Sequence, residues 1–236
     1  MKKTIVWLAC ILLSFGIKAQ TVIGAWETYH TSKDGEKHKS VIIFSDGYQV
    51  LTTYNAITGQ FIHSKGGTWM LKGGSITETI EFDTDNSGLV GKELSFKVAV
   101  SDSIFEKVDE KKQFKKIDNG APGLLQGAWL MSGRVKDGET QLRDTGGPRK
   151  TMKILSGTRF QWIAYHTGTK QFMGTGGGTY TTVNGVYTEN IEFFSKDDSR
   201  VGARLKFKFD LIDGHWHHSG LSSKGDPIHE IWRIRE

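Results

Sequence analysis

Apolar and polar residues alternate along much of the chain after residue 20. The clearest stretch is 205–211, where Leu, Phe, Phe and Leu alternate with Lys, Lys and Asp. This period of two indicates a half-buried antiparallel strand. Asp213-Gly214 then predicts a hairpin turn into residues 215–218, and Asn184-Gly185 predicts another between Thr179–Val183 and Val186–Phe193. Apolar residues at helical spacing are absent from residues 20–236, so we expect an all-β protein.

An internal repeat divides the chain into two similar halves. The stretch from Gly176 to Phe193 resembles the stretch from Gly66 to Phe82, and their matching residues lie 111 positions apart. The Gly-Ala-Trp segments at 24–26 and 127–129 lie 103 apart, so the second copy carries eight extra residues. We expect these in a longer loop near 143–148, where turn-forming residues gather. A period near 110 exceeds the roughly 20–50 residues of solenoid repeats and indicates a duplicated domain.

The domain boundaries follow from the repeat and from the composition. We expect a signal peptide at 1–19, an N-terminal β-domain at 20–118, a linker at 119–123 and a C-terminal β-domain at 124–236. The second half predicts eight to ten strands without crossovers. Such a meander closes most simply as an antiparallel up-and-down barrel, with an open sandwich as the alternative.

The first residues predict export. A basic start at 1–3 and an apolar run at 4–17 precede Ala19, so we expect a periplasmic or secreted protein with no membrane span after cleavage. Cys10 is the only cysteine, and the residues before it form a poor lipid-attachment motif, so a lipid anchor is not expected. Cleavage would leave a chain without disulfides.

The charge does not favour nucleic acid as a partner. The chain carries a formal net charge of +5, of which three charges belong to lysines in the leader, leaving +2 for the remainder. Such a small net charge predicts a solvated surface on which positive and negative side chains are mixed. The sequence does not indicate an oligomeric state.

A set of short motifs extends over nearly all of residues 124–236. These motifs are Gly127-Ala128-Trp129, Phe160-Gln161-Trp162, Tyr165, Gly177-Gly178-Thr179-Tyr180, Tyr187-Thr188-Glu189, Val201-Gly202, His217-His218-Ser219-Gly220 and His229-Glu230-Ile231-Trp232-Arg233. As a set they resemble the lipocalin-like domain of unknown function found in exported bacterial proteins. This resemblance implies a lipocalin-like, calycin-type barrel and brings no established chemistry. The first half departs from the pattern at its end, where Glu106 and Lys107 replace His217 and His218.

Candidate ligand-binding residues are polar and aromatic side chains of the second copy. Aromatic faces suit sugar rings or flat apolar molecules inside a small barrel. Trp162 is a strong candidate because the first copy has Leu51 at its position, whereas Trp26 and Trp129 occupy matched positions and are expected to fill the cores. The candidates are Trp162, His166, Tyr180, Glu189, His217, Glu230 and Arg233.

The histidines at 215–218 leave two interpretations open. His215 and His217 share a strand face and are weak metal candidates, but no third ligand is fixed, so no metal or other cofactor is predicted. Alternatively, Trp216 and His218 point inward while His215 and His217 are solvated.

The repeated glutamates indicate structure. Glu189 and Glu192 are three residues apart, as are Glu78 and Glu81, so one of each pair should point into its barrel and the other outward. A buried carboxylate needs a partner, and the sequence offers Arg233, Arg204 and Tyr180.

The sequence favours a binding protein over an enzyme. The glycines at 174–178 lack the Lys-Ser/Thr of a phosphate-binding loop and are interpreted as a turn or bulge before a strand. We expect an exported protein whose C-terminal barrel binds an apolar or carbohydrate-like small molecule. The alternatives are a cell-envelope interaction protein with filled barrels, or a lyase, isomerase or glycan-active enzyme using His217 or His166 with Glu189 and Arg233.

Overall fold

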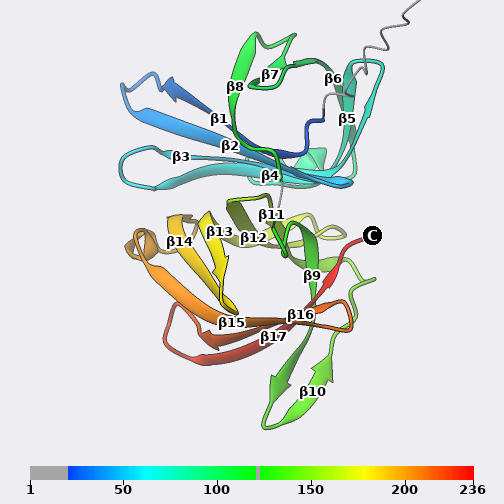
Figure 1. Cartoon of the computed structure of the whole chain (residues 1–236). Coiled ribbons are helices and arrows are strands. Elements are labelled where there is room, and N and C mark those ends of the chain that lie inside the picture. Colours follow the sequence, from blue (N-terminus) through cyan, green and yellow to red (C-terminus); the bar gives the residue numbers. More distant parts are fainter. Residues whose placement is uncertain (1–20, 121–122) are drawn as a thin grey trace, which may run out of the picture.

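A computed structural model describes residues 21–120 and 123–236, which form two stacked β-barrels (Figure 1). The expected signal peptide at 1–19, including Cys10, lies outside the described residues, as do residues 121–122 of the expected linker. The two helices within the described ranges are single 3₁₀ turns, Ser87–Leu89 (η1) and Asp198–Arg200 (η2). None of the described helices has the length and apolarity that a membrane crossing requires.

The first barrel is an antiparallel meander of eight strands that closes on itself. Each strand pairs with the next in sequence, and β1 pairs with β8 to complete the ring. Its strands are β1 (Gly24–Thr31), β2 (Lys37–Ser45), β3 (Tyr48–Asn55), β4 (Phe61–Lys72), β5 (Ser75–Asp83), β6 (Glu93–Val100), β7 (Ile104–Lys107) and β8 (Lys112–Asp118).

The second barrel repeats this order and adds one strand. β9 pairs with both β11 and β17, which closes eight strands, while β10 extends β9 as a short hairpin. The extra residues of the second copy therefore form β10 and the loop after it, where the sequence predicted a loop alone. Its strands are β9 (Gly127–Lys136), β10 (Glu139–Leu142), β11 (Arg149–Leu155), β12 (Arg159–His166), β13 (Gln171–Val183), β14 (Val186–Phe194), β15 (Arg204–Ile212), β16 (His215–Leu221) and β17 (Pro227–Ile234).

Local turn chemistry sets the predicted hairpins. Asn184 and Gly185 have φ angles of 50° and 74°, and Asp213 and Gly214 have 51° and 76°, which suits two-residue turns that need positive φ twice. The prediction of both hairpins is confirmed. The glycines at 174–178 do not precede a strand but lie within β13, where the pairing with β14 shifts register between Gly177 and Gly178. The bulge interpretation is therefore confirmed, and the turn interpretation is wrong.

Each barrel is plugged at one end by a tryptophan at matched positions. The indole Nε1 of Trp26 donates to the carbonyl of Val22 at 2.8 Å, and that of Trp129 donates to the carbonyl of Leu125 at 2.9 Å. Both indoles lie in the interior apolar cluster of their own barrel. The expectation that these two residues fill the cores is confirmed.

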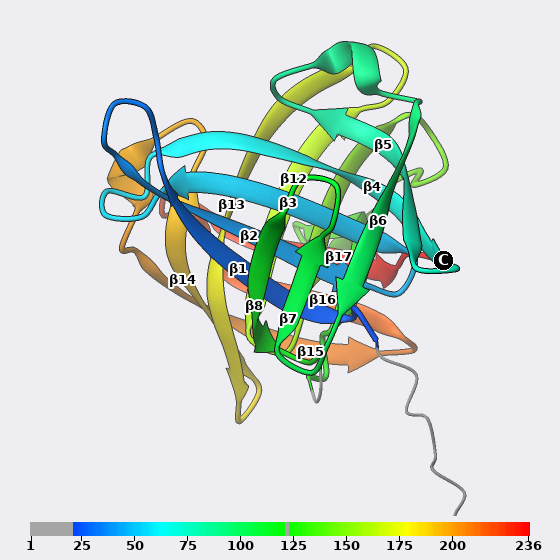
Figure 2. The same cartoon turned by 90° about the horizontal axis from the view of Figure 1, so that it is seen from above.

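A third apolar cluster joins the two barrels. It combines outward-facing residues of both, from Val41 and Val50 on one side to Met152 and Ile163 on the other. β2, β3 and β5 contact β11, β12 and β13, and the strands of the two barrels cross steeply (Figure 2). Because a barrel without this partner would expose these side chains to water, the burial holds the barrels together.

Two matched polar contacts link the barrels, and in each of them a tyrosine of one barrel donates to a glutamate of the other. Glu192 accepts hydrogen bonds from both terminal nitrogens of Arg159 at 2.7 Å and from Tyr54 at 2.5 Å. Glu81, 111 residues earlier, accepts from Arg235 and from Tyr165, which is the counterpart of Tyr54. The two tyrosine contacts are reciprocal, as is typical of a two-fold interface, whereas Arg159 lies in the same barrel as Glu192.

The outward-facing glutamates therefore hold the barrels together. Glu78 and Glu189 are buried in the barrels, and Glu81 and Glu192 point outward, so the prediction of opposite faces is confirmed. The predicted partners of the buried carboxylate were wrong, because Lys153 pairs with Glu189 and Lys65 with Glu78. Arg159 and Arg235 bind the outward pair, whereas Arg233, Arg204 and Tyr180 bind none of the four glutamates in the described part of the chain.

Candidate functional site

A cavity of about 170 Å³ lies inside the second barrel, toward the end opposite the Trp129 plug. Its wall mixes aromatic rings with ionisable and hydroxyl side chains from β11, β12 and β14–β17. Pockets that combine apolar walls with a few polar groups are the usual form of small-ligand sites. The lining residues are Thr151, Lys153, Trp162, Glu189, Ile191, Phe194, Leu205, Phe207, His218, Ser222, Ser223, Ile228, Glu230 and Trp232.

A buried ion pair crosses the barrel interior beside this cavity. Lys153 Nζ lies 2.8 Å from Glu189 Oε1, and the two side chains are 6% and 5% exposed. Alternation along β11 turns Lys153 inward between Met152 and Ile154, which face the other barrel. The ammonium also lies between 5.1 and 5.8 Å from four ring centroids, a distance at which aromatic faces stabilise a cation. These rings belong to Tyr187, Phe207, Trp216 and Trp232.

His218 and Glu230 form a second polar pair in the same wall. His218 Nδ1 lies 3.2 Å from Glu230 Oε2, which also accepts from Trp232 Nε1 at 3.2 Å. Burial and the nearby Lys153 lower the pKa of His218. Burial alone would raise the pKa of Glu230, but the hydrogen bond from His218 and the charge of Lys153 bring it below its ordinary value. At neutral pH the carboxylate is therefore ionised and the imidazole neutral.

The tautomer of His218 follows from this contact. An ionised carboxylate only accepts hydrogen bonds, so Nδ1 carries the proton and Nε2 presents a lone pair. His218 is 1% exposed, and its Nε2 has no hydrogen-bond partner among the described residues. A buried polar atom left unpaired costs about 1–3 kcal/mol.

The glycines of β13 make room for Trp162 beside the cavity. A Cβ added at Gly176 would meet the Trp162 Nε1 at 2.7 Å, and one at Gly174 would lie 3.6 Å from the same ring. Trp162 also packs edge-on against Phe194, with ring centroids 5.3 Å apart. The absence of a side chain at Gly176 therefore lets the indole form part of the wall, whereas a Cβ at Gly174 would make only an ordinary van der Waals contact with the ring.

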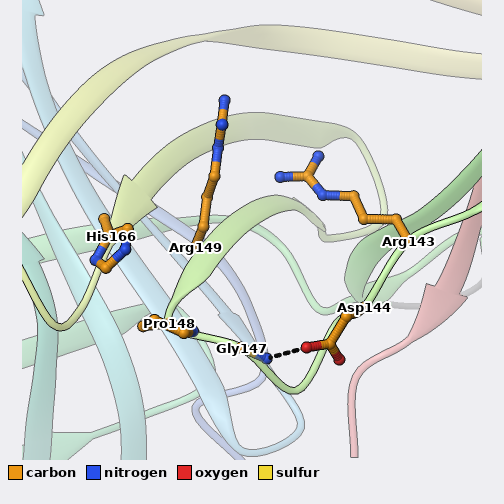
Figure 3. A pocket seen from close by; sticks show the side chains of 6 residues that line it. All are labelled: Arg143, Asp144, Gly147, Pro148, Arg149 and His166. Carbon is orange, nitrogen blue, oxygen red and sulfur yellow. Dashed lines mark hydrogen bonds between the residues drawn. The ribbon is translucent and has the colours of Figure 1, made fainter.

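A second hollow, of about 390 Å³, lies at the rim of the second barrel (Figure 3). It is lined by the loop after β10, the first residue of β11 and the last residue of β12. Arg143 and Arg149 extend from two sides of it, and the guanidinium of Arg143 is directed toward the Arg149 side chain. Gly147 donates its N–H to the Asp144 carboxylate at 3.1 Å. Pro148 and His166 complete the lining.

The structure brings some of the predicted residues together and separates others. Trp162, Glu189 and Glu230 line the cavity, and His166 lines the rim hollow. Tyr180 is buried at the plugged end, where its hydroxyl donates to the Ser156 carbonyl.

His217 and Arg233 lie on the outside of the barrel wall. Trp216 and His218 are buried at 0% and 1% exposure, so the interpretation in which they point inward is confirmed. His215 is exposed, and His217 meets His229 at 3.2 Å on the outer surface. The acid–base set proposed for an enzyme, His217 or His166 with Glu189 and Arg233, is therefore not assembled at one point. Within residues 21–120 and 123–236, no three His, Cys, Asp or Glu side chains gather as a metal would need.

The residues that sequence reasoning missed are Lys153, His218, Arg143 and Arg149. A lone lysine in the apolar run Met152–Leu155 was the available signal for the first, since alternation turns it inward. His218 shares its strand face with Trp216, and one interpretation of residues 215–218 already turned both side chains inward, but only as core residues. The two arginines flank the inserted loop, whose position was predicted but whose side chains were not considered.

Comparison with known proteins identifies the second barrel only. Residues 124–235 match the model of a family described as Domain of unknown function (DUF4488). The match spans the whole second barrel and less than half of the chain. No curated protein matches the chain significantly.

Proposed function

We propose that this is an exported, lipocalin-like binding protein whose C-terminal barrel takes a small, polar, carbohydrate-like molecule into the cavity beside Lys153, Glu189 and His218. Eight-stranded barrels of this kind are wide enough to hold one small ligand. The basic and apolar leader at 1–19 supports export. The first barrel acts as a scaffold joined to the binding barrel.

The unpaired Nε2 of His218 carries the proposal. It is a hydrogen-bond acceptor, it is buried, and its side chain lines a cavity. A ligand hydroxyl or N–H that donates to this atom would remove the cost of leaving it unpaired. A site built to receive a donor also rejects analogues that lack one, which provides specificity.

The composition of the wall favours a ligand with hydroxyl groups over a purely apolar one. An apolar ligand would remove water from the carboxylate of Glu230 and the hydroxyls of Ser222 and Ser223 without replacing their hydrogen bonds, which is unfavourable. Trp162 and Trp232 supply flat apolar faces, so the wall suits a ring with an apolar face and polar edges.

The volume limits the ligand to a small molecule. About 170 Å³ is below the roughly 300–1,000 Å³ of pockets that hold drug-sized ligands. A single ring therefore fits better than an oligosaccharide or a long acyl chain.

A ligand screen on the chain from Gln20 tests the proposal. Trp162 and Trp232 line the cavity, so binding should change tryptophan fluorescence as well as the melting temperature. We expect monosaccharides or similar polyols to produce saturable changes, and fatty acids and bile acids to produce none. Trp162→Ala should weaken binding about tenfold or more through loss of a stacking face.

The matched control is Leu51→Ala, which changes the corresponding position of the first barrel. It should leave the affinity of the same ligand unchanged. Equal losses in both variants, or saturable binding of apolar ligands alone, would contradict the proposed site.

Export is tested separately. The chain expressed from Met1 in a Gram-negative host should be recovered from the periplasm or medium with Gln20 as its first residue, as intact-mass measurement would show. Recovery of the full-length chain from the cytoplasm would contradict export.

A further inference from the structure

The rim hollow and the cavity are linked by one contact, between Arg143, which lines the hollow, and Thr151, which lines the cavity. In this contact Arg143 donates from its Nη1 to Thr151 Oγ1 at 3.3 Å. Arg149, Thr151 and Lys153 are alternate residues of β11, so they follow one another on the inner side of the strand from rim to interior. A ligand lying in the cavity therefore has its outer end close to the two arginines.

The two arginines carry positive charges that no acid neutralises. Neither forms an ion pair within the described ranges, and burial together with the charge of Arg149 lowers the pKa of Arg143. The one acid in the hollow, Asp144, has its oxygens engaged by the N–H groups of Gly146 and Gly147 at 2.8 and 3.1 Å. Two guanidinium groups that line one hollow and form no ion pair with a carboxylate among the described residues are suited to binding an oxyanion.

His166 adds a further donor to the hollow. The backbone N–H of Thr169 donates to His166 Nδ1 at 3.0 Å, so in the neutral ring the proton resides on Nε2. In register pairing His166 lies opposite Arg149, at the ends of neighbouring strands. The lining thus offers three donor side chains on residues that the inserted loop and the rim bring together.

The corresponding rim of the first barrel lacks this charge. His38 and Asn55 occupy the positions of Arg149 and His166, and both contact the carboxylate of Glu36, at 3.4 Å each. The loop that carries Arg143 is the insertion of the second copy. The basic rim is therefore a property of the second barrel and not of the repeated scaffold.

We infer that Arg143 and Arg149 bind an anionic group at the mouth of the C-terminal barrel, so that the ligand is an acidic one bearing a carboxylate, sulfate or phosphate. This inference rests on the proposed function, because it assigns the charged end of the molecule whose ring lies in the cavity. A uronic acid or a sugar phosphate has this combination of groups.

Titration of the chain from Gln20 with inorganic sulfate tests the anion site directly. At constant ionic strength with chloride as the reference anion, the amide NMR signals of Gly147, Arg149 and His166 should shift saturably. Arg149→Ala and Arg143→Gln should each weaken binding about tenfold, since charge-assisted hydrogen bonds are the strong ones. The double variant should abolish the shifts.

Arg134→Ala is the matched control, because Arg134 is an exposed arginine of the same barrel that is bound to Gln141 outside this hollow. It should bind sulfate like the unaltered chain. Absence of a saturable shift, or equal affinity in the double variant, would overturn the anion site.

A pair of sugars separates this inference from the proposed function. Galacturonic acid should bind more tightly than galactose to the unaltered chain, and the double variant should remove this preference. Equal binding of both sugars, lost only in Trp162→Ala, would overturn the anion site while leaving the cavity proposal intact. Sulfate binding without any sugar sensitive to Trp162→Ala would support the anion site and contradict the sugar-binding cavity.

Discussion

The two barrels place a glutamate at the same point of the inner wall but neutralise it from different strands. In the first barrel, Lys65 of β4 lies 3.5 Å from Glu78; in the second, Lys153 of β11 lies 2.8 Å from Glu189. The position that matches Lys65 is Gly176 in the second copy, and the position that matches Lys153 is Ile42 in the first. The glutamate therefore occupies matched positions in the two barrels, whereas its lysine partner comes from β4 in the first barrel and from β11 in the second.

This exchange changes what the barrel can contain. A lysine on β4 fills the space that Gly176 leaves free on β13, where Trp162 packs. With the lysine on β11 instead, the Trp162 indole packs against Gly176 and lines a cavity together with Lys153. The repeated scaffold thus tolerates different linings, and the proposed ligand site rests on the lining of the second copy.

At the interface between the barrels, in contrast to the barrel interiors, matched residues of the two copies make matched contacts. Tyr54 and Tyr165 are matched residues, each donating to the outward glutamate of the other copy. Phe61 and Phe172, also matched, stack on each other with an interplanar angle of 7°. Residues that face the partner barrel therefore remain alike because both copies use them in the same contact.

The largest expected effect is a difference in stability between variants that lack the lysine of one or the other inner ion pair. Lys153→Met should destabilise the protein by about 3–5 kcal/mol, because it leaves Glu189 buried without its partner. Lys65→Met should cost about 1 kcal/mol, since Lys65 is 17% exposed and Lys107 still interacts with Glu78. Urea unfolding measures both free energies.

The double variant Lys153→Met, Glu189→Gln controls for the loss of the lysine side chain itself. It should recover part of the stability, because the unpaired charge is then gone. Equal costs for the two lysine variants would show that the inner pairs are equivalent and would contradict the comparison.

The next largest expected effect is a loss of stability at acid pH, caused by protonation of Glu192 at the interface between the barrels. Burial alone would raise the pKa of Glu192, but hydrogen bonds and charge from Arg159 lower it to about 2. The carboxyl therefore binds protons more weakly in the folded state than in the unfolded one. Its stabilisation is fully present above about pH 4.5 and is lost as the pH falls toward 2. It amounts to roughly 2–3 kcal/mol, allowing for its partial exposure.

Glu192→Gln should remove this part of the acid dependence between pH 4.5 and 2. Unfolding free energies at several pH values measure it, and Glu139→Gln, at an exposed strand position, serves as control. An unchanged slope in Glu192→Gln would show that the interface carboxylate does not account for the acid sensitivity.

The repeat made most of the fold predictable. Matching the copies fixed two domains, and alternation with Asn-Gly and Asp-Gly turns gave the meander, because strand period and turn chemistry are local properties. Most partners of Glu192 and Glu81 were not predictable in this way, since Tyr54, Tyr165 and Arg235 lie in the other barrel, 84 to 154 residues away in the sequence. The pairing of Lys153 with Glu189 required the strand order and the direction of both side chains.

The site was predictable only where one copy differs from the other. Trp162 stood out against Leu51 and does line the cavity. The same comparison, applied to Lys153 against Ile42 and to Arg149 against His38, would have found two of the four residues that pattern reasoning missed. His217 and Arg233 failed as cavity residues because alternation along β16 and β17 turns them outward.

The smallest expected effect concerns the glycines that accommodate the indole. Gly176→Ala places a methyl group 2.7 Å from Trp162 Nε1, so the ring must move toward the cavity. We expect a destabilisation of about 1–2 kcal/mol, a shift in tryptophan emission and weaker binding of any cavity ligand. Gly185→Ala, in a turn where an added Cβ meets nothing within 4 Å but φ is positive, gives a control of similar cost without a change in binding. If Gly176→Ala lowered stability but left emission and affinity like those of the control, the indole would not be the wall of the site, and the difference between the barrels would lie in the lysine alone.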